Sequence, residues 1–183
     1  NSIDELLQQA DLAMYQAKAA GKNMIKFFDV AMQVKASERT RLESELREAI
    51  KRQQLQLYFQ GLHDGQGKLL GAEVLLRWFH PELGTVSPAV FIPIAEESGL
   101  IFEIGSWVIE QACRQLASWS KSNQALQLKL SVNISARQFY LPEFVSTVQQ
   151  LLQQYRFNTG CLMLELTESL VLADLDDAVA RMQ

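Results

Sequence analysis

The second half of the chain alternates strand-like and helix-like segments, and this alternation constrains its fold more than any other feature. Short apolar runs of strand length are each followed by a longer segment with apolar residues at helical spacing. The sequence predicts strands at Leu69–Trp78, Leu126–Ser135 and Cys161–Thr167, and helices at Ala89–Glu97, Ile101–Trp119, Leu141–Tyr155 and after Ser169. Repeats of this kind build a mainly parallel sheet covered by helices, either as an open doubly wound sheet or as a (β/α) barrel. The expected fold class is therefore α/β.

A further strand precedes this repeat. Residues Leu55–Leu62 alternate polar and apolar side chains, and the cluster His63–Gly67 is rich in turn-forming residues. A connection this short joins the strand to Leu69–Trp78 as a hairpin, and hairpin strands are antiparallel. We therefore expect the first strand of the sheet to run against the strands that follow it.

The N-terminal part of the chain is predicted to be mainly helical. Residues 3–20 place apolar side chains at helical spacing, Gly21 ends the pattern, and Met24–Phe28 has the composition of a short strand. Residues Val30–Gln54 are rich in charges and helix formers and predict a connecting helix. Dimerisation through this helix is an alternative interpretation, because its row of apolar residues is too short to identify or to exclude a coiled coil.

Composition excludes several classes of function. The 183 residues are 48% hydrophobic and 21% charged, as is typical of a globular protein. A net charge of −4 and the lack of a basic run argue against a nucleic-acid polymer as partner. No apolar run reaches the roughly 18–20 residues that span a bilayer, and the polar, acidic N-terminus is unlike a signal peptide, so a cytoplasmic location is expected. Cys113 and Cys161 lack metal-type spacing and are expected to be reduced core thiols.

The predicted strand Leu69–Trp78 carries two charged residues within an apolar run. Glu73 and Arg77 are four residues apart, so in a strand their side chains share one face. A buried carboxylate is costly unless a cation or a protonated state compensates it. The stretch alone is compatible with an ion pair between Glu73 and Arg77 and with a bound metal or ligand.

Each of the three later strands offers one oxygen-bearing side chain on its polar face. Glu73 lies on the first, Asn133 on the second beside Ser131, and Glu165 on the third. Two carboxylates and an amide oxygen suit Mg²⁺, Mn²⁺ or Ca²⁺ better than zinc, which prefers histidine and cysteine. The two histidines fall in predicted loops and are expected to be solvated. Separately satisfied polar residues remain the alternative to a metal site.

Five motifs occur in an order that resembles the EAL domain, the cyclic di-GMP phosphodiesterase family. They are Gln60 after Leu57-Tyr58-Phe59, Glu73-Val74-Leu75-Leu76-Arg77-Trp78, Phe91-Ile92-Pro93-Ile94-Ala95-Glu96, Ser131-Val132-Asn133-Ile134-Ser135 and Glu165-Leu166-Thr167-Glu168-Ser169. The segment Ala10–Lys18, followed by Gly21-Lys22-Asn23, resembles the last helix and strand of a GGDEF (diguanylate cyclase) domain. The resemblance implies a GGDEF remnant at residues 1–29, a linker beginning at 30–40 and the N-terminal half of an EAL domain at 41–183.

The resemblance also implies a fold and an activity. The fold is a TIM-like (β/α) barrel, of which this chain would contain only part. Its first strand is antiparallel to the others and is preceded by a linker helix. The activity is hydrolysis of cyclic di-GMP to linear pGpG with two divalent ions, Mg²⁺ or Mn²⁺. Carried over to this sequence, the metal ligands are Glu73, Asn133 and Glu165, the catalytic residues are Glu73 and Glu168, and the substrate-binding residues are Gln60, Leu76, Arg77 and Gln138. Glu168 matches a residue that positions a neighbouring catalytic loop.

Some features depart from the family pattern. Val74 replaces the usual alanine, but it has the opposite parity to Glu73 and is expected to pack toward the helices. Gly61 stands where the family usually has proline, which is expected to loosen that strand end. The family's remaining metal-binding acids and its lysine are expected beyond Gln183.

The chain alone is therefore expected neither to close a barrel nor to hydrolyse the dinucleotide. Its open sheet edges are expected to be covered by a second copy or by another chain. Two alternatives to the phosphodiesterase remain. One is a degenerate EAL domain that binds cyclic di-GMP without cutting it and relays the signal. The other is a dimerisation module that acts through the helix predicted at Val30–Gln54.

Overall fold

The computed structural model describes residues 2–19, 21, 23–121 and 128–166. The chain divides into two compact units, residues 1–46 and residues 47–183. The first unit holds helix α1 (Ile3–Ala19) and most of helix α2 (Val30–Ala49), and the second holds the sheet and the remaining helices. Across the described ranges, no helix combines the length and the apolar character that a membrane crossing requires.

The N-terminal unit confirms the two predicted helices and corrects the predicted strand. Residues Met24–Phe28 form no strand, and Ile25 and Phe27 are each 85% exposed. A strand is stable only when a neighbour pairs with its backbone, and no described segment pairs with this one. Helix α2 also ends at Ala49, earlier than expected, because the backbone turns at Gln53, where φ is 54°.

The second unit is built on a mixed five-stranded sheet in the order β1-β2-β4-β5, with β3 paired to the end of β2. Its strands are β1 (Leu55–His63), β2 (Leu69–His80), β3 (Gly84–Val86), β4 (Lys129–Ile134) and β5 (Leu162–Leu166). Strands β1 and β2 are antiparallel, whereas β2, β4 and β5 are parallel. The antiparallel first strand is therefore confirmed. Strand β3 lies in a segment, between the predicted strand Leu69–Trp78 and the predicted helix Ala89–Glu97, for which the sequence predicted neither strand nor helix.

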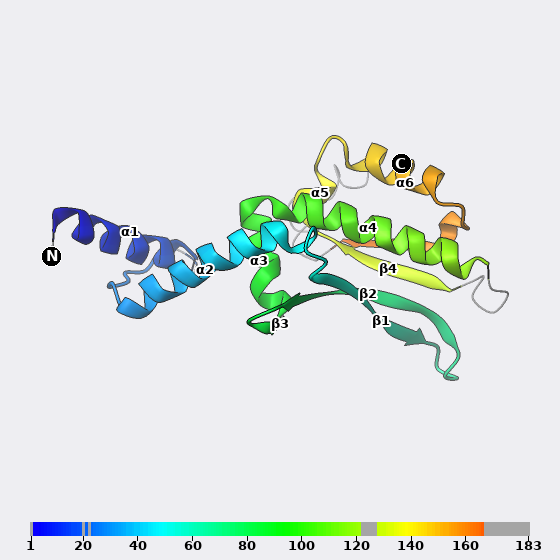
Figure 1. The fold of residues 1–183 in the computed structure, drawn as a ribbon, viewed down its shortest axis with the longest axis horizontal. Helices are drawn as coiled ribbons and strands as arrows, with labels where there is room; N and C mark the ends of the chain where they lie inside the picture. The colour runs from blue at the N-terminus through cyan, green and yellow to red at the C-terminus, as the bar shows by residue number, and fades with distance from the viewer. Residues whose placement is uncertain (1, 20, 22, 122–127, 167–183) are drawn as a thin grey trace. The chain divides into compact units, whose positions relative to one another are not determined.

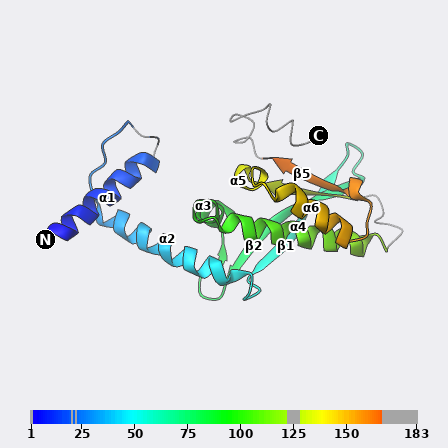
Figure 2. The same ribbon diagram turned by 90° about the horizontal axis from the view of Figure 1, so that it is seen from above.

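Helices connect the parallel strands and lie along one face of the sheet. They are α3 (Pro88–Ser98), α4 (Leu100–Trp119), the single turn α5 (Ala136–Phe139), α6 (Phe144–Gln154) and the 3-10 turn η1 (Thr159–Cys161). Gly99 separates α3 from α4 in a left-handed conformation, with φ 79°, that glycine adopts without strain. Figures 1 and 2 show α4 running along the sheet with α6 beside it.

The core lies between this helical layer and one face of the sheet. Val74 on β2 and Leu130 and Val132 on β4 are buried there against apolar residues of α4 such as Ile104. Trp78 is fully buried, its indole donates to the Gln54 side chain (3.1 Å), and its ring meets Phe91 edge to face. The α/β class is confirmed, and the described residues form an open sheet whose other face carries the polar side chains.

His80 and the two cysteines were also given expected surroundings from the sequence. His80 is 4% exposed rather than solvated, because it ends β2 against Trp78. Its Nδ1 accepts hydrogen bonds from the backbone N–H groups of Glu82 (3.2 Å) and Leu83 (3.1 Å). The thiols of Cys113 and Cys161 are buried, as expected. Burial, with a smaller contribution from the charge of Glu110, raises the pKa of the Cys113 thiol to about 11.

Candidate active site

The strand register brings the predicted ligands onto one face of the sheet. Glu73 on β2 pairs with Ser131 on β4, and Asn133 on β4 pairs with Glu165 on β5. Directly paired residues share a face, and so do residues two apart in a strand. Gln60 on β1 pairs with Glu73 from the other side and belongs to the same face. Side chains from four neighbouring strands therefore form one polar surface, which we call the polar face.

A hydrogen bond links two of the predicted metal ligands. Asn133 Nδ2 donates to Glu73 Oε1 over 2.8 Å, between residues sixty positions apart in sequence. Arg77 makes its contacts elsewhere, so within the described residues Glu73 is held by Asn133 rather than by an ion pair with Arg77. With its nitrogen committed to Glu73, the Asn133 side chain has its oxygen available as a ligand.

The third ligand is held by a residue to which sequence analysis assigned no role. Ser131 Oγ donates a short hydrogen bond to Glu165 Oε1. Ser131 is 2% exposed, whereas Glu165 is half-buried. Ser131 and Asn133 are two residues apart in one strand, so the sequence already indicated that both side chains lie on the polar face. This spacing does not tell which neighbouring side chain the Ser131 hydroxyl contacts.

Arg77 lies at the carboxyl end of β2, where its side chain is half-buried. Its Nη1 donates to the carbonyl oxygen of Leu76 over 3.0 Å. Its guanidinium carbon lies 5.9 Å from the centroid of the Tyr58 ring, at the outer range of a cation–π contact. Tyr58 pairs with Leu75 across the hairpin and so shares the polar face, a position that the alternation of β1 already indicated.

The remaining predicted site residues have varied surroundings. Gln60 is exposed on the polar face, and Leu76 is half-buried. Gln138 is 4% exposed and caps α5: its Oε1 accepts from the Ser135 N–H (3.2 Å), and its own N–H donates to Ser135 Oγ (3.3 Å). These bonds give Gln138 a structural task. Glu168 lies outside the described residues.

A pocket of about 220 Å³ lies where β2 and β4 end beneath α3 and α4. Its polar lining includes Arg77, Glu96, Asn133, Ser135 and Gln138. This volume is below the roughly 300–1,000 Å³ of typical ligand pockets. The pocket can therefore take only part of a larger ligand.

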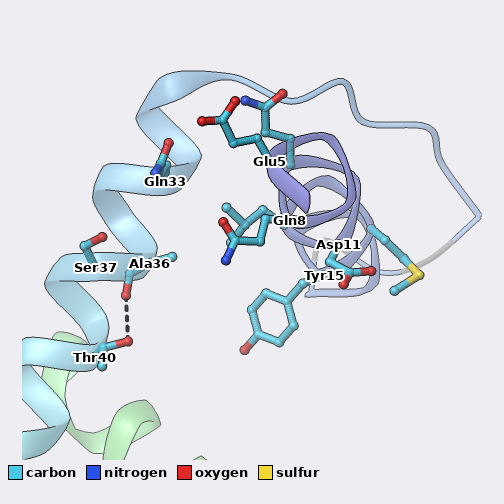
Figure 3. A pocket seen from close by; sticks show the side chains of 11 residues that line it. Glu5, Gln8, Asp11, Tyr15, Gln33, Ala36, Ser37 and Thr40 are labelled. Atoms are coloured by element: carbon cyan, nitrogen blue, oxygen red, sulfur yellow. Dashed lines mark hydrogen bonds between the residues drawn. The ribbon is translucent and has the colours of Figure 1, made fainter. Parts of the chain in front are cut away.

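A larger hollow of about 800 Å³ lies in the N-terminal unit between α1 and α2. Figure 3 shows Glu5, Gln8, Asp11 and Tyr15 of α1 opposite Gln33, Ser37 and Thr40 of α2. The Thr40 hydroxyl donates to the Ala36 carbonyl of its own helix over 3.0 Å. The acidic and amide groups of this hollow are not organised around a common point, so the polar face is the better candidate site.

The donor set of the polar face suits a hard divalent cation. Its two carboxylates and one amide come from three adjacent parallel strands. Asn133 and Glu165 are the next-to-last residues of β4 and β5, the strand ends at which α/β folds bind ligands, and Glu73 lies within β2. Among the described residues, no group of three or more histidine, cysteine, aspartate or glutamate side chains is clustered as a metal site. A metal site on the polar face would therefore need the amide oxygen of Asn133 as well as Glu73 and Glu165. The two carboxylates on their own would form only part of a coordination shell.

Comparison with known proteins identifies the family. Residues 43–183 match the family profile described as the EAL domain. The chain belongs to the EAL domain family. This match covers the whole sheet and all the predicted site residues.

The relatives of this EAL chain include named enzymes. It is 40% identical over 173 residues to the bifunctional diguanylate cyclase/cyclic di-GMP phosphodiesterase MucR of Pseudomonas aeruginosa, covering 94% of this chain and 25% of MucR. It is 35% identical over 178 residues to the cyclic di-GMP phosphodiesterase PdeR of Escherichia coli, covering 97% of this chain and 27% of PdeR. The chain thus spans about a quarter of the length of these curated relatives.

Solved EAL structures share the fold. The MucR phosphodiesterase in complex with cyclic di-GMP is 38% identical, with a TM-score of 0.73 over 77% of this chain and 57% of that one. The Xanthomonas citri FimX EAL domain in complex with cyclic di-GMP is 28% identical, with a TM-score of 0.70 over 82% of this chain and 58% of that one. The described sheet and the helices α3–α6 that cover it are therefore those of an EAL domain.

Proposed function

We propose that this chain is the N-terminal part of an EAL domain that hydrolyses cyclic di-GMP to linear pGpG. Residues 41–183 would form that part, residues 30–40 the start of a linker, and residues 1–29 the end of a GGDEF domain. The observation that carries the proposal is the meeting of Glu73, Asn133 and Glu165 on the polar face. The named activities of MucR and PdeR support it.

The polar face fits divalent metal ions by its donor chemistry. Glu73 and Glu165 would each offer a carboxylate oxygen, and Asn133 its amide oxygen, to Mg²⁺ or Mn²⁺. When bound, a pair of such ions activates a water molecule and offsets charge on the phosphoryl oxygens. The rest of the coordination shell would come from acids beyond Gln183. The task of this chain would be to hold its three ligands together on adjacent strands of the polar face.

Substrate binding would use the residues around these ligands. Arg77, half-buried at the end of β2, would hold a phosphate by charge-assisted hydrogen bonds, beside Leu76. Gln60, exposed next to Glu73 in the sheet, would contact the nucleotide. Gln138 would act from the end of the small pocket, supporting the backbone after Asn133. Glu168 would position a neighbouring catalytic loop.

The sheet of this chain would be completed by further strands of the same domain, closing a TIM-like barrel. Without them β1 and β5 remain edges, and open edges pair readily with other chains. If residues 1–183 were produced alone, a second copy or another chain would cover these edges. That piece is expected to lack phosphodiesterase activity in an assay where the full-length protein is active.

The decisive experiment removes one ligand charge. In the full-length protein, Glu73→Gln keeps the shape of the side chain but removes a charged oxygen, so turnover of cyclic di-GMP should fall by much more than tenfold at saturating Mg²⁺ or Mn²⁺. Glu143→Gln, an exposed change at the start of α6, is the matched control and should retain activity.

Unchanged turnover in Glu73→Gln would refute the proposed site. If the unsubstituted protein binds cyclic di-GMP but never hydrolyses it, the non-hydrolysing receptor replaces the enzyme as the conclusion. The complex of the FimX EAL domain with cyclic di-GMP makes nucleotide binding worth measuring separately from hydrolysis.

A further inference from the structure

The polar face contains a buried hydroxyl that contacts a proposed ligand but was given no part in the reaction. We infer that Ser131 is a positioning residue that fixes the carboxylate of Glu165 for metal binding. This inference rests on the proposed function, because it concerns the same metal site. It adds to the site a residue that touches neither the substrate nor the metal.

The strand register makes the contact between Ser131 and Glu165 a diagonal one. Ser131 lies directly opposite Met163 on β5, and Glu165 lies two residues further along that strand. Diagonal neighbours are about 7–8 Å apart at their α-carbons, so only a side chain that leans along the strand closes the gap. The Ser131 hydroxyl therefore holds the Glu165 side chain back toward the start of the strand.

Asn133 does not compete with Ser131 for this carboxylate. Asn133 is the residue directly opposite Glu165, yet its Nδ2 donates diagonally to Glu73 on the other side of β4. Strand β4 thus supplies one donor to each flanking carboxylate. If Ser131 were absent, the only donor to Glu165 found among the described residues would be lost.

The chemistry of a serine hydroxyl suits this task. It can donate one hydrogen bond to a carboxylate oxygen and so fix the orientation of that carboxylate. Ser131 contacts Oε1 only, so Oε2 and the second lone pair of Oε1 stay available for coordination. Burial to 2% exposure limits competition from water for the same hydroxyl. Metal ligands are commonly oriented by such neighbours, and losing one typically costs about 10–100-fold in metal affinity.

The test measures metal binding apart from catalysis. In the full-length protein, the Mn²⁺ binding isotherm is recorded by electron paramagnetic resonance without nucleotide, and hydrolysis is then measured as a function of Mn²⁺ concentration. Ser131→Ala should raise the Mn²⁺ dissociation constant about 10–100-fold, while kcat at saturating Mn²⁺ falls much less. Ser131→Cys keeps the shape of the side chain but donates weakly, so it should behave like Ser131→Ala.

Two further variants separate positioning from a general loss of stability. Ser98→Ala removes a half-buried hydroxyl that bonds the Ile94 carbonyl (2.7 Å) in α3, and it should leave the Mn²⁺ isotherm unchanged. Ser131→Ala should also have little additional effect when Glu165 is already glutamine, because residues that act through one another are not additive. Thermal unfolding of each variant in the absence of metal shows that the protein is folded.

The possible outcomes separate the role of Ser131 from the proposed function on which it depends. An unsubstituted protein that binds no Mn²⁺ would overturn the proposed metal site itself. A protein that binds Mn²⁺ and hydrolyses cyclic di-GMP, but whose Ser131→Ala variant binds Mn²⁺ equally well, would overturn the role of Ser131 alone. Full additivity with Glu165→Gln would also overturn it.

Discussion

Gly105 on α4 is predicted to be intolerant of even one added methyl group. The Cβ of an alanine there would overlap Nε2 of Gln138 and lie 2.9 Å from its Oε1. The Gln138 amide could swing away, but it is 4% exposed, and its Oε1 accepts the Ser135 N–H that begins α5. A shift would leave that backbone donor without its acceptor and force a polar side chain into packed surroundings.

The magnitudes decide the sign of the effect. Alanine is favoured over glycine within a helix by about 1 kcal/mol. Against this, overpacking a core costs about 1–3 kcal/mol, and a buried polar group that loses its partner costs another 1–3 kcal/mol or so. The net destabilisation of Gly105→Ala is therefore roughly 1–5 kcal/mol, which at about 2–4 °C per kcal/mol places the expected fall in Tm near 10 °C.

The assay is thermal unfolding of the full-length protein, supported by a double-mutant cycle. Gln138→Ala alone should destabilise through loss of the cap, by about 1 kcal/mol. In the Gln138→Ala background the obstruction is gone, so Gly105→Ala should become neutral or stabilising by up to about 1 kcal/mol. If Gly105→Ala lowered Tm equally in both backgrounds, the contact between α4 and Gln138 could not be the cause.

The other predictions concern a thiol and a guanidinium. Burial raises the pKa of the Cys113 thiol from its ordinary value of 9.0 to about 11, so the unfolded thiol ionises first as pH rises. The free energy of unfolding should therefore fall between pH 9 and 11, by no more than about 2–3 kcal/mol. Cys113→Ala, compared by urea unfolding over that range, should lose this part of the pH dependence, and an identical dependence would show that the thiol does not contribute. Arg77→Lys keeps the positive charge but loses the planar guanidinium that can bind a phosphate through two hydrogen bonds. The KM for cyclic di-GMP should therefore rise several-fold, while the Mn²⁺ binding isotherm stays unchanged. An unchanged KM would show that Arg77 does not contact the phosphate.

The sheet and its polar face followed from local patterns in the sequence. The apolar run Leu69–Trp78 and the helical spacing of Ile101–Trp119 are properties of a few neighbouring residues, and the structure forms β2 and α4 there. The parity of Glu73, Asn133 and Glu165 within their strands predicted that each lies on the polar face, and the register agrees. Their assignment as metal ligands came from family resemblance and remains a prediction.

Features that depend on distant partners could not be predicted in this way. The apolar stretch Met24–Phe28 has strand composition, but a strand also needs a neighbour, and none of the described segments pairs with this stretch. Strand β3 is three residues long and forms only because the end of β2 lies beside it. The burial of His80 likewise depends on Trp78 and the turn that follows β2. The diagonal contacts of Ser131 and Asn133 required the register as well as the parity.

The position of β4 explains how two carboxylates can lie on one face before any cation binds. Glu73 and Glu165 belong to strands on either side of β4, so about two strand spacings of roughly 4.8 Å separate their backbones. The residues between them, Ser131 and Asn133, are neutral donors, and each one bonds a different carboxylate. An acidic residue at Asn133 would lose the donor to Glu73 and add a third negative charge to the face. With both carboxylates held by β4, neither needs Arg77 as its partner, and the guanidinium stays available for the phosphate contact proposed for it.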